Sequence, residues 1–305
     1  MPSGRWSSEI ATDPDVRRSI LRRYAVSVED KIGEGDEAEA YALGAHDIIK
    51  IFKPVCHPET IERRRTFYDM ADARTISFAI SKIFDHKQMD GVHYTVEARI
   101  AGTSLTDALP RFDATRRRDA LLAYAATATE ISEIVYPLRL FGEIVSVPPL
   151  VADSWSDFVL ARVRTDLSRS LPRLASTIDH PHRAIDRIES LLAKRSAVEP
   201  RLVHGDYYPA NVMADAQGRI VGVIDFGGLT LSGDPRLDAA ASVLHLTGLD
   251  GITESDRQVV LGHLRNRGLT DGDLALYRLF YAVRFLDTPR AGLRRWCLAT
   301  IQAAC

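Results

Sequence analysis

Short runs of apolar residues, separated by turn residues, follow one another along the first third of the chain. They cover residues 26–32, 40–43, 47–52, 76–84 and 92–100. Short runs that are rich in β-branched and aromatic side chains and bounded by turn residues are typical of strands. The pattern therefore predicts a five-stranded sheet in this part of the chain.

The segment before these strands has the composition of a short basic helix. Thr12 and Asp13 are both suitable N-caps, and Pro14 suits a first helical position, where the backbone N–H has no partner within the helix. We therefore expect a helix over residues 12–23, ahead of the first strand.

Helical periodicity dominates the remainder of the chain. Between residues 105 and 200, apolar residues recur at the spacing of three and four that places them on one face of a helix. The same pattern returns from residue 251 onward, with breaks near Gly268 and Gly272 and at Pro289. These segments predict a set of packed helices.

Strands followed by helices predict an α+β protein with two lobes. We expect a strand-rich N-lobe over residues 1–101 and a helical C-lobe over residues 102–305, with no linker, repeat or low-complexity tract between them. A chain of 305 residues is long enough for two lobes that share a cleft and a sizeable core.

Composition and charge argue against a membrane-spanning or nucleic-acid-binding protein. An apolar content of 46% and a charged content of 26% are ordinary for a soluble globular protein, and a net charge of −2 offers no electrostatic attraction to nucleic acid or an anionic membrane. No apolar run approaches the length of a membrane span, and the N-terminus lacks the apolar core of a signal peptide. Cys56, Cys297 and Cys305 have no metal-ligand spacing. We expect a cytoplasmic protein that is a monomer or a homodimer.

The most specific chemical pattern lies between residues 202 and 227. An apolar run ends in His204-Gly205-Asp206, Asn211 follows five residues after the Asp, and a second apolar run ends in Asp225. Phosphoryl transfer from a nucleotide requires a carboxylate beside the attacking hydroxyl. It also requires a carboxylate and an amide oxygen that hold Mg²⁺ against the triphosphate. Asp206, Asn211 and Asp225 have the residue types and the spacing for these roles.

These motifs resemble those of the aminoglycoside phosphotransferase and choline kinase-like family, small-molecule kinases that are related to protein kinases. The family pattern reads HGDxxxxN, then IDF or IDW, then GDPxxDxA, and the last motif is matched here by residues 233–240. A protein kinase would have His-Arg-Asp and a later Ala-Pro-Glu, whereas Gly205 stands in place of Arg and no Ala-Pro-Glu follows Gly227. The resemblance implies a bilobal protein-kinase-like fold with a five-stranded antiparallel N-lobe sheet.

The motif residues divide into reacting and supporting groups. We expect Asp206 to accept a hydrogen bond from the substrate hydroxyl and orient it for attack, and Asn211 and Asp225 to hold Mg²⁺. His204 is expected to stabilise the loop through hydrogen bonds. The resemblance implies that Asp238 braces the same loop.

A lysine on the third predicted strand is the candidate for phosphate contact. Lys50 is a charged residue among apolar neighbours, and kinases carry on this strand a Lys that contacts the α- and β-phosphates. Lys53 is the rival, but it lies at the strand end and faces the opposite side. The resemblance implies that a helix carboxylate pairs with this Lys. We expect Glu62 in that role, with Glu59 or no pairing at all as the alternatives.

Two further segments of the N-lobe are candidates for nucleotide binding. Gly33 and Gly35 form a two-glycine turn between the first two strands, which allows backbone N–H groups to approach phosphates. Residues 93–105 resemble the hinge of the family. Backbone groups around Glu97 to Arg99 are then expected to hold the edge of the nucleotide base, which does not distinguish ATP from GTP.

The function that follows is a kinase that uses ATP, or GTP, with Mg²⁺ to phosphorylate a hydroxyl of a small molecule. We expect an antibiotic acceptor (aminoglycoside, nucleoside or another sugar-containing compound) and a role in resistance. The alternatives are a metabolic small-molecule kinase and a protein kinase-like or non-catalytic nucleotide-binding module. An excess of arginine over acidic residues from residue 251 onward disfavours a strongly cationic acceptor. The arginines are Arg257, Arg265, Arg267, Arg278, Arg284, Arg290, Arg294 and Arg295, against Glu254, Asp256, Asp271, Asp273 and Asp287.

Overall fold

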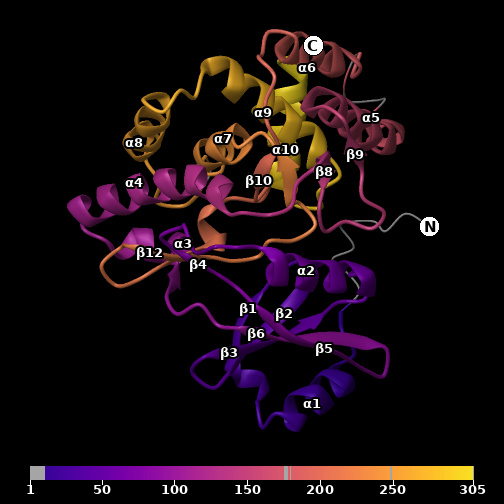
Figure 1. Cartoon of the computed structure of the whole chain (residues 1–305), viewed down its shortest axis with the longest axis vertical. Helices are drawn as coiled ribbons and strands as arrows, with labels where there is room; N and C mark the ends of the chain where they lie inside the picture. The colour runs from indigo at the N-terminus through magenta and orange to yellow at the C-terminus, as the bar shows by residue number, and fades with distance from the viewer. Residues whose placement is uncertain (1–10, 175–177, 179, 248, 305) are drawn as a thin grey trace.

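The first hundred residues build one lobe around an antiparallel sheet, and the rest of the chain builds a larger, mainly helical lobe (Figure 1). The computed structural model describes residues 11–174, 178, 180–247 and 249–304. None of the helices among these residues is both long enough and apolar enough to cross a lipid bilayer.

The N-lobe sheet has five strands in the order β1-β2-β3-β6-β5, and every neighbouring pair is antiparallel, which confirms the expected fold. The strands are β1 Lys31–Glu34, β2 Ala38–Leu43, β3 Asp47–Phe52, β5 Ile83–Met89 and β6 Val92–Ala98.

Two of the predicted strands are displaced. Val28–Asp30 form a 3₁₀ turn, because Ser27 and Asp30 cap it reciprocally, and the first strand begins only at Lys31. The strand predicted over residues 76–84 lies further on, at Ile83–Met89. Ala79–Ile80 form a short strand, β4, that pairs in parallel with β12, Ile220–Val223, of the other lobe. A short apolar run does not reveal which sheet it will join.

Two helices cover opposite faces of the N-lobe sheet (Figure 1). Helix α1, Pro14–Arg23, is capped by the Asp13 carboxylate, which accepts the N–H of Asp15 at 2.8 Å. Its buried residues pack in one cluster with Ile49 and Ile51 of β3. Helix α2, Pro58–Met70, lies on the side of the sheet that faces the C-lobe.

The C-lobe is built mainly from helices, as the periodicity predicts. They are α3 Leu105–Ala108, α4 Ala114–Glu130, α5 Trp155–Leu174, α6 Arg183–Leu192, α7 Arg236–Leu244, α8 Glu254–Arg265, α9 Asp271–Arg284 and α10 Ala291–Gln302, with 3₁₀ turns at Leu109–Arg111, Ile131–Glu133 and Pro209–Asn211. The breaks expected near Gly268 and at Pro289 separate α8 from α9 and α9 from α10, whereas Gly272 lies within the first turn of α9.

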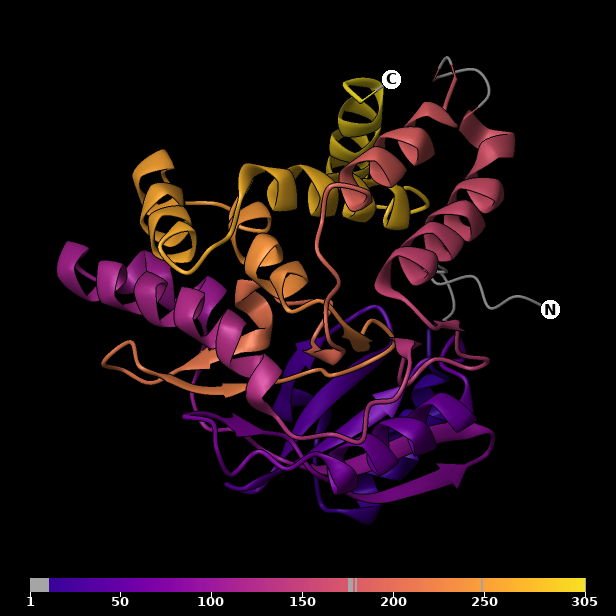
Figure 2. The same ribbon diagram turned by 45° about the horizontal axis from the view of Figure 1, so that its top comes forward.

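Two small sheets carry the catalytic motifs between the N-lobe and the C-terminal helices (Figure 2). Their orders are β10-β13-β8-β9 and β4-β12-β11-β7. The strands are β7 Thr103–Ser104, β8 Phe141–Glu143, β9 Val151–Ala152, β10 Arg201–Val203, β11 Val212–Ala214, β12 Ile220–Val223 and β13 Leu231–Gly233.

Helix α9 holds the loop that carries His204, Gly205 and Asp206 against the core of the C-lobe. The Tyr281 hydroxyl donates to the carbonyl of Gly205 at 3.0 Å, and Trp155 of α5 donates to the Tyr277 hydroxyl at 3.1 Å. At the C-terminal end of α9, Arg284 is buried against Glu143 at 3.3 Å and Asp166 at 3.4 Å. Buried charges of this kind require their partners, so the end of α9 is held in one position.

Candidate active site

The catalytic loop starts where β10 ends, and His204 ties it to the second motif. His204 is fully buried, its Nε2 lies 2.9 Å from the carbonyl of Ile224, and its Nδ1 accepts the N–H of Asp206 at 3.2 Å. These two contacts select the tautomer that carries its proton on Nε2. Burial lowers the pKa of His204 to about 4, so the ring is neutral and joins the two motifs without taking part in proton transfer.

Asp238 of α7 holds the same loop from behind. Its carboxylate accepts the N–H of His204 at 2.6 Å and of Gly205 at 2.9 Å, and the residue is 1% exposed. Burial raises the pKa of Asp238 to about 7, although the two donors favour the charged form. Gly205 has φ +76°, and a Cβ there would collide with the carbonyl of Leu229. The loop therefore requires Gly between His and Asp.

Asn211 and Asp206 face each other across the loop. The Asn211 Nδ2 group donates to the backbone carbonyl of Asp206 at 3.0 Å and lies 3.4 Å from Oδ2 of the Asp206 side chain. These contacts occupy the amide nitrogen and turn the amide oxygen away from Asp206. Burial and the nearby charge of Asp225 raise the pKa of Asp206 to about 7. Asp206 is thus a carboxyl group that titrates near neutral pH.

Asp225 follows β12 with φ +67°, a left-handed conformation that is uncommon for a residue with a side chain. Its Oδ1 lies 2.8 Å from Lys50 Nζ and 3.8 Å from Arg64 Nη1. The charge of Lys50, together with that of Arg64, holds the pKa of Asp225 well below its ordinary value. Asp225 is therefore a permanent carboxylate at the junction of the two lobes.

Phe226 anchors Asp225 between the lobes. It is fully buried, stacks on Phe67 of α2 at 5.4 Å between ring centroids, and lies 4.5 Å from the His204 ring. The position of α2 and that of the catalytic loop are therefore coupled through one aromatic side chain.

The two candidate lysines, Lys50 within β3 and Lys53 just after it, have different partners. Lys50 lies on the face of the sheet opposite to Ile49 and Ile51, and its Nζ reaches Asp225. Burial alone would lower the pKa of Lys50, but the charges of Asp225 and Glu97 outweigh it and the net direction is upward. Lys53 instead donates to the Gly35 carbonyl at 2.8 Å and to Glu34 at 3.0 Å.

The expected pairing of Lys50 with a carboxylate of α2 does not form. Glu62 is half exposed and contacts His86 Nδ1 at 2.5 Å, and Glu59 lies 3.9 Å from Arg63. Both carboxylates lie on the outer part of the helix, away from Lys50, because the inward face carries other residues. This corrects the role expected for Glu62.

Arg64 is the α2 residue that reaches the site, and the sequence interpretation missed it. Its side chain is 2% exposed, and its Nη2 lies 2.6 Å from Glu37 Oε2. Ile61, Arg64 and Tyr68 are all buried on one face of α2. Their spacing of three and four residues is the pattern of an inward helix face. An arginine at one of these otherwise apolar positions was therefore the signal in the sequence that could have identified Arg64 as a site residue.

The two-glycine turn lies over the site and is held from both lobes. Gly33 belongs to β1, and the N–H of Gly35 donates to the Ala38 carbonyl at 2.9 Å to close the turn. Within the turn, Asp36 pairs with Arg290 of the C-lobe at 3.0 Å, and Glu37 pairs with Arg64 of α2.

One backbone amide of the expected hinge already has a partner within the protein. The N–H of Arg99 donates to the His46 carbonyl at 2.7 Å, so this amide is not free for a nucleotide base. Glu97 is 5% exposed and accepts from Thr95 Oγ1 at 2.6 Å. Because Thr95 lies directly opposite Lys50, Glu97 shares the face of the sheet that carries Lys50.

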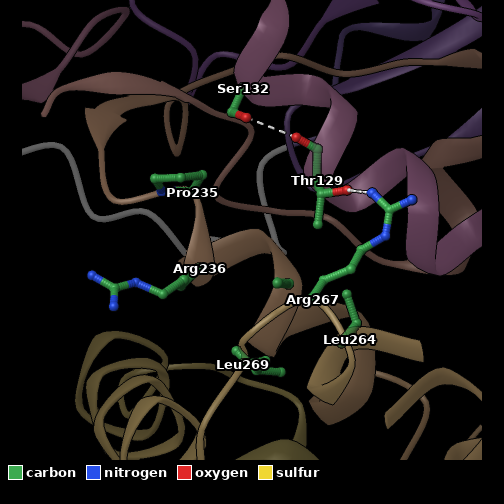
Figure 3. Close-up of a pocket in the computed structure, with 8 residues that line it drawn as sticks. Thr129, Ser132, Pro235, Arg236, Leu264, Arg267 and Leu269 are labelled. Atoms are coloured by element: carbon green, nitrogen blue, oxygen red, sulfur yellow. Dashed lines mark hydrogen bonds between the residues drawn. The ribbon is translucent and has the colours of Figure 1, made fainter. Parts of the chain in front are cut away.

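One hollow of the C-lobe lies outside this group of residues. It has a volume of about 170 Å³ and is lined by residues of α4, α7, α8 and their neighbouring turns (Figure 3). Arg267 donates there to the Thr129 hydroxyl at 3.3 Å. Neither Asp206, Asn211 nor Asp225 lines the hollow, so it is distinct from the candidate site.

Comparison with known proteins shows which family this arrangement belongs to. A family model described as "Phosphotransferase enzyme family" matches residues 30–277, a segment that contains every candidate residue from Lys50 to Asp238. The chain belongs to this family. It is accordingly a phosphotransferase that acts on an alcohol group.

Solved structures of aminoglycoside phosphotransferases share the fold. A thermostable mutant of APH(4)-Ia in ternary complex with ADP and hygromycin B has a TM-score of 0.72 at 18% identity, covering 95% of this chain and 97% of that chain. ADP-bound APH(2'')-Ib has a TM-score of 0.63 at 16% identity, covering 95% and 97%. The gentamicin complex of APH(2'')-IIa has a TM-score of 0.63 at 15% identity, covering 96% of each chain.

We expect Lys50→Ala and Lys53→Ala to differ sharply in activity. Lys50 pairs with Asp225, whereas Lys53 is bound to Glu34 and the Gly35 carbonyl, so only Lys50→Ala removes the cation beside Asp225. Steady-state kinetics should show a loss of about 100-fold or more in kcat for Lys50→Ala, and less than about tenfold for Lys53→Ala. Equal losses, or a larger loss at Lys53, would contradict this reading of the strand.

The raised pKa of Asp206 predicts a pH-dependent stability. The folded protein binds the proton of the Asp206 carboxyl more tightly than the unfolded chain does. The wild type therefore loses stability relative to Asp206→Asn as the pH rises from about 4 to about 7. Each unit of pKa difference between the folded and unfolded states corresponds to about 1.4 kcal/mol, and the partial exposure of Asp206 reduces the total. We expect the variant to gain about 2 kcal/mol in free energy of unfolding between about pH 4 and pH 8, measured by urea denaturation.

Asp215→Asn is the matched control. The Asp215 carboxylate lies 2.7 Å from Arg219 and its pKa is lowered, so its contribution to stability is present above the ordinary pKa and is lost as the pH falls. This variant should show the opposite trend with pH. The same trend in both variants would rule out the assignment for Asp206.

Proposed function

We propose that the protein uses ATP, or GTP, together with Mg²⁺ to phosphorylate a hydroxyl of a small molecule. The observation that carries the proposal is the meeting of Lys50, Asp225 and the Asp206 loop at one point between the lobes. The Lys50–Asp225 pair joins residues 175 positions apart in the chain. This brings a cation for phosphate, a permanent carboxylate and a carboxyl group that titrates near neutrality to one site.

Asp206 is the proposed partner of the acceptor hydroxyl. As a carboxylate it accepts a hydrogen bond from the hydroxyl and directs the oxygen towards the terminal phosphorus. Phosphoryl transfer depends mainly on positioning and charge neutralisation, so early removal of the proton is unnecessary. A pKa of about 7 also suits Asp206 to take up that proton as the new bond forms.

Asn211 and Asp225 are the proposed ligands of Mg²⁺. A carboxylate and an amide oxygen are the hard oxygen donors that this ion prefers. Among the described residues, no group of three or more His, Cys, Asp or Glu side chains could hold a metal alone. Asn211 and Asp225 would therefore hold the ion together with oxygens of the bound nucleotide. When bound, Mg²⁺ neutralises charge that develops on the phosphates.

The acceptor is proposed to be neutral or acidic. The arginine excess of the C-terminal segment is weaker evidence than its count suggests, because several of these residues have local partners. Arg265 pairs with Asp271 at 2.6 Å, and Arg284 is buried between two carboxylates. Arg290 also has a partner, Asp36 of the glycine turn, but its charge in addition opposes the rise in the pKa of Asp206. A cation whose charge acts on Asp206 disfavours a polycationic acceptor beside that residue.

A hydroxylated antibiotic is the proposed acceptor class. The solved relatives include complexes with hygromycin B and gentamicin, which supports this class without identifying the compound. The charge of Arg290 favours a nucleoside or a neutral sugar-containing compound within it. We propose a role in resistance and a cytoplasmic location, where nucleotide and Mg²⁺ are abundant.

The kinase assignment is tested with Asp206→Ala and Asp225→Ala. Each should lower phosphoryl transfer by about 1000-fold or more in assays with radiolabelled ATP and a panel of hydroxylated acceptors, because each removes a charge from the reacting centre. Asp225→Ala should in addition weaken Mg²⁺-dependent nucleotide binding, which Asp206→Ala should leave intact. Circular dichroism establishes that both variants are folded. Turnover within about tenfold of the wild type in either variant would refute the proposal.

Acceptor charge is tested by comparing substrates at low ionic strength, where the screening length is about 30 Å. A nucleoside or neutral sugar antibiotic should have a higher kcat/KM than a polyamine aminoglycoside. Arg290→Gln should raise kcat/KM for the polyamine by about three- to tenfold, and Arg294→Gln, an exposed position on α10, should not change it. Efficient turnover of the polyamine by the wild type, with affinity that falls steeply with salt, would contradict the proposed acceptor class.

A further inference from the structure

Arg64 has more hydrogen-bonding capacity than its present surroundings use. Its Nη2 pairs with Glu37, but Nε and Nη1 are buried without a hydrogen-bond partner among the described residues. A guanidinium group carries five N–H donors, and buried donors are almost always satisfied. The unpaired Nη1 is the atom that faces Asp225, at 3.8 Å.

The surroundings of Arg64 are arranged so that the guanidinium remains beside Asp225. Its Cζ lies 5.8 Å from the centroid of the Phe52 ring, which supports it from the strand side. On the other side, a Cβ at Gly227 would lie 3.0 Å from Arg64 Nη2, closer than an ordinary contact. The missing side chain at Gly227 therefore leaves the space that the guanidinium occupies.

Arg64 is buried, but the two carboxylates next to it are partly exposed to solvent. Glu37 and Asp225 are 46% and 43% exposed, although Arg64 itself is 2% exposed. Both carboxylates belong to segments that are expected to contact the nucleotide, the glycine turn and the Mg²⁺ ligand. A ligand that displaces either carboxylate from Arg64 must itself be an anion.

We propose that Arg64 binds a phosphate oxygen of the nucleotide through Nη1, next to Lys50. The inference rests on the proposed function, since it requires a nucleotide in this site. Asp225 is expected to turn towards Mg²⁺ when the nucleotide binds, which leaves Lys50 and Arg64 to face the phosphates together. The planar guanidinium matches phosphate oxygens well. Glu37 holds the guanidinium in place through Nη2, and its negative charge offsets part of the attraction between Arg64 and a phosphate.

Two variants with opposite expected effects test this role. The affinities of the full-length protein for ADP and for adenosine are measured by titration calorimetry in the presence of Mg²⁺. Arg64→Gln should weaken ADP binding by about tenfold or more and leave adenosine binding unchanged, because only the phosphate contact is lost. Glu37→Gln should strengthen ADP binding by about two- to fivefold, because Gln still accepts from Nη2 but removes the negative charge that offsets the guanidinium. Arg65→Gln, a half-exposed arginine of the same helix, is the control and should change neither affinity.

The alternative is that Arg64 only fastens the glycine turn through Glu37. In that case Arg64→Gln and Glu37→Gln would weaken ADP binding equally, and adenosine binding would fall with it, which would overturn the inference. If Arg64→Gln does not fold, Glu37→Gln decides alone: tighter ADP binding supports the phosphate contact and weaker binding overturns it. If the wild type binds ADP and Arg64→Gln binds it equally well, this inference is overturned while the proposed function stands. Absence of ADP binding in the wild type overturns the proposed function as well.

Discussion

The ion pair between Lys50 and Asp225 is the interaction on which the arrangement of the site depends. It spans 2.8 Å and joins the central part of the N-lobe sheet to the segment that follows β12. A partly buried pair is costly to break, since the charge left behind would lack a partner. The pair therefore joins the two lobes at the point where the phosphates of the nucleotide are proposed to bind. It also keeps Asp225 ionised, which its proposed role as a Mg²⁺ ligand requires.

The loop that carries Asp206 is held by groups that do not react. The His204 ring joins the loop to Ile224, and the Asp238 carboxylate accepts two N–H groups of the loop. A neutral ring and a buried carboxyl provide fixed hydrogen bonds without adding a competing base. The conformation at Gly205 then explains why the motif reads His-Gly-Asp. Rigid support of this kind reduces the reorganisation that the reaction requires.

The glycine turn has contacts in three directions, and this is where the chain departs most from the expected kinase pattern. Lys53, which follows β3, donates to the backbone of the turn, Arg64 of α2 pairs with Glu37, and Arg290 of the C-lobe pairs with Asp36. A cation on α2 takes the place in which a carboxylate was expected. The counter-charges of Lys50 are consequently Asp225 and Glu97. Lys50 and Arg64 thus lie side by side at this point, each beside its own carboxylate.

The sequence by itself determined the fold class, the five-stranded sheet and the motif residues from His204 to Asp238. Local periodicity and closely spaced motifs carry that information within short stretches of chain. It also determined the direction of Lys50, because neighbouring strand residues face opposite sides. Only the tertiary structure decided which side chain of α2 reaches the site, because Glu62 and Arg64 differ by two positions on one helix and their partners are distant in sequence. The same holds for residues 79–80, which join a sheet of the other lobe, and for the amide of Arg99, which donates to His46. Contacts of this kind depend on how separate segments pack, and no local pattern records that.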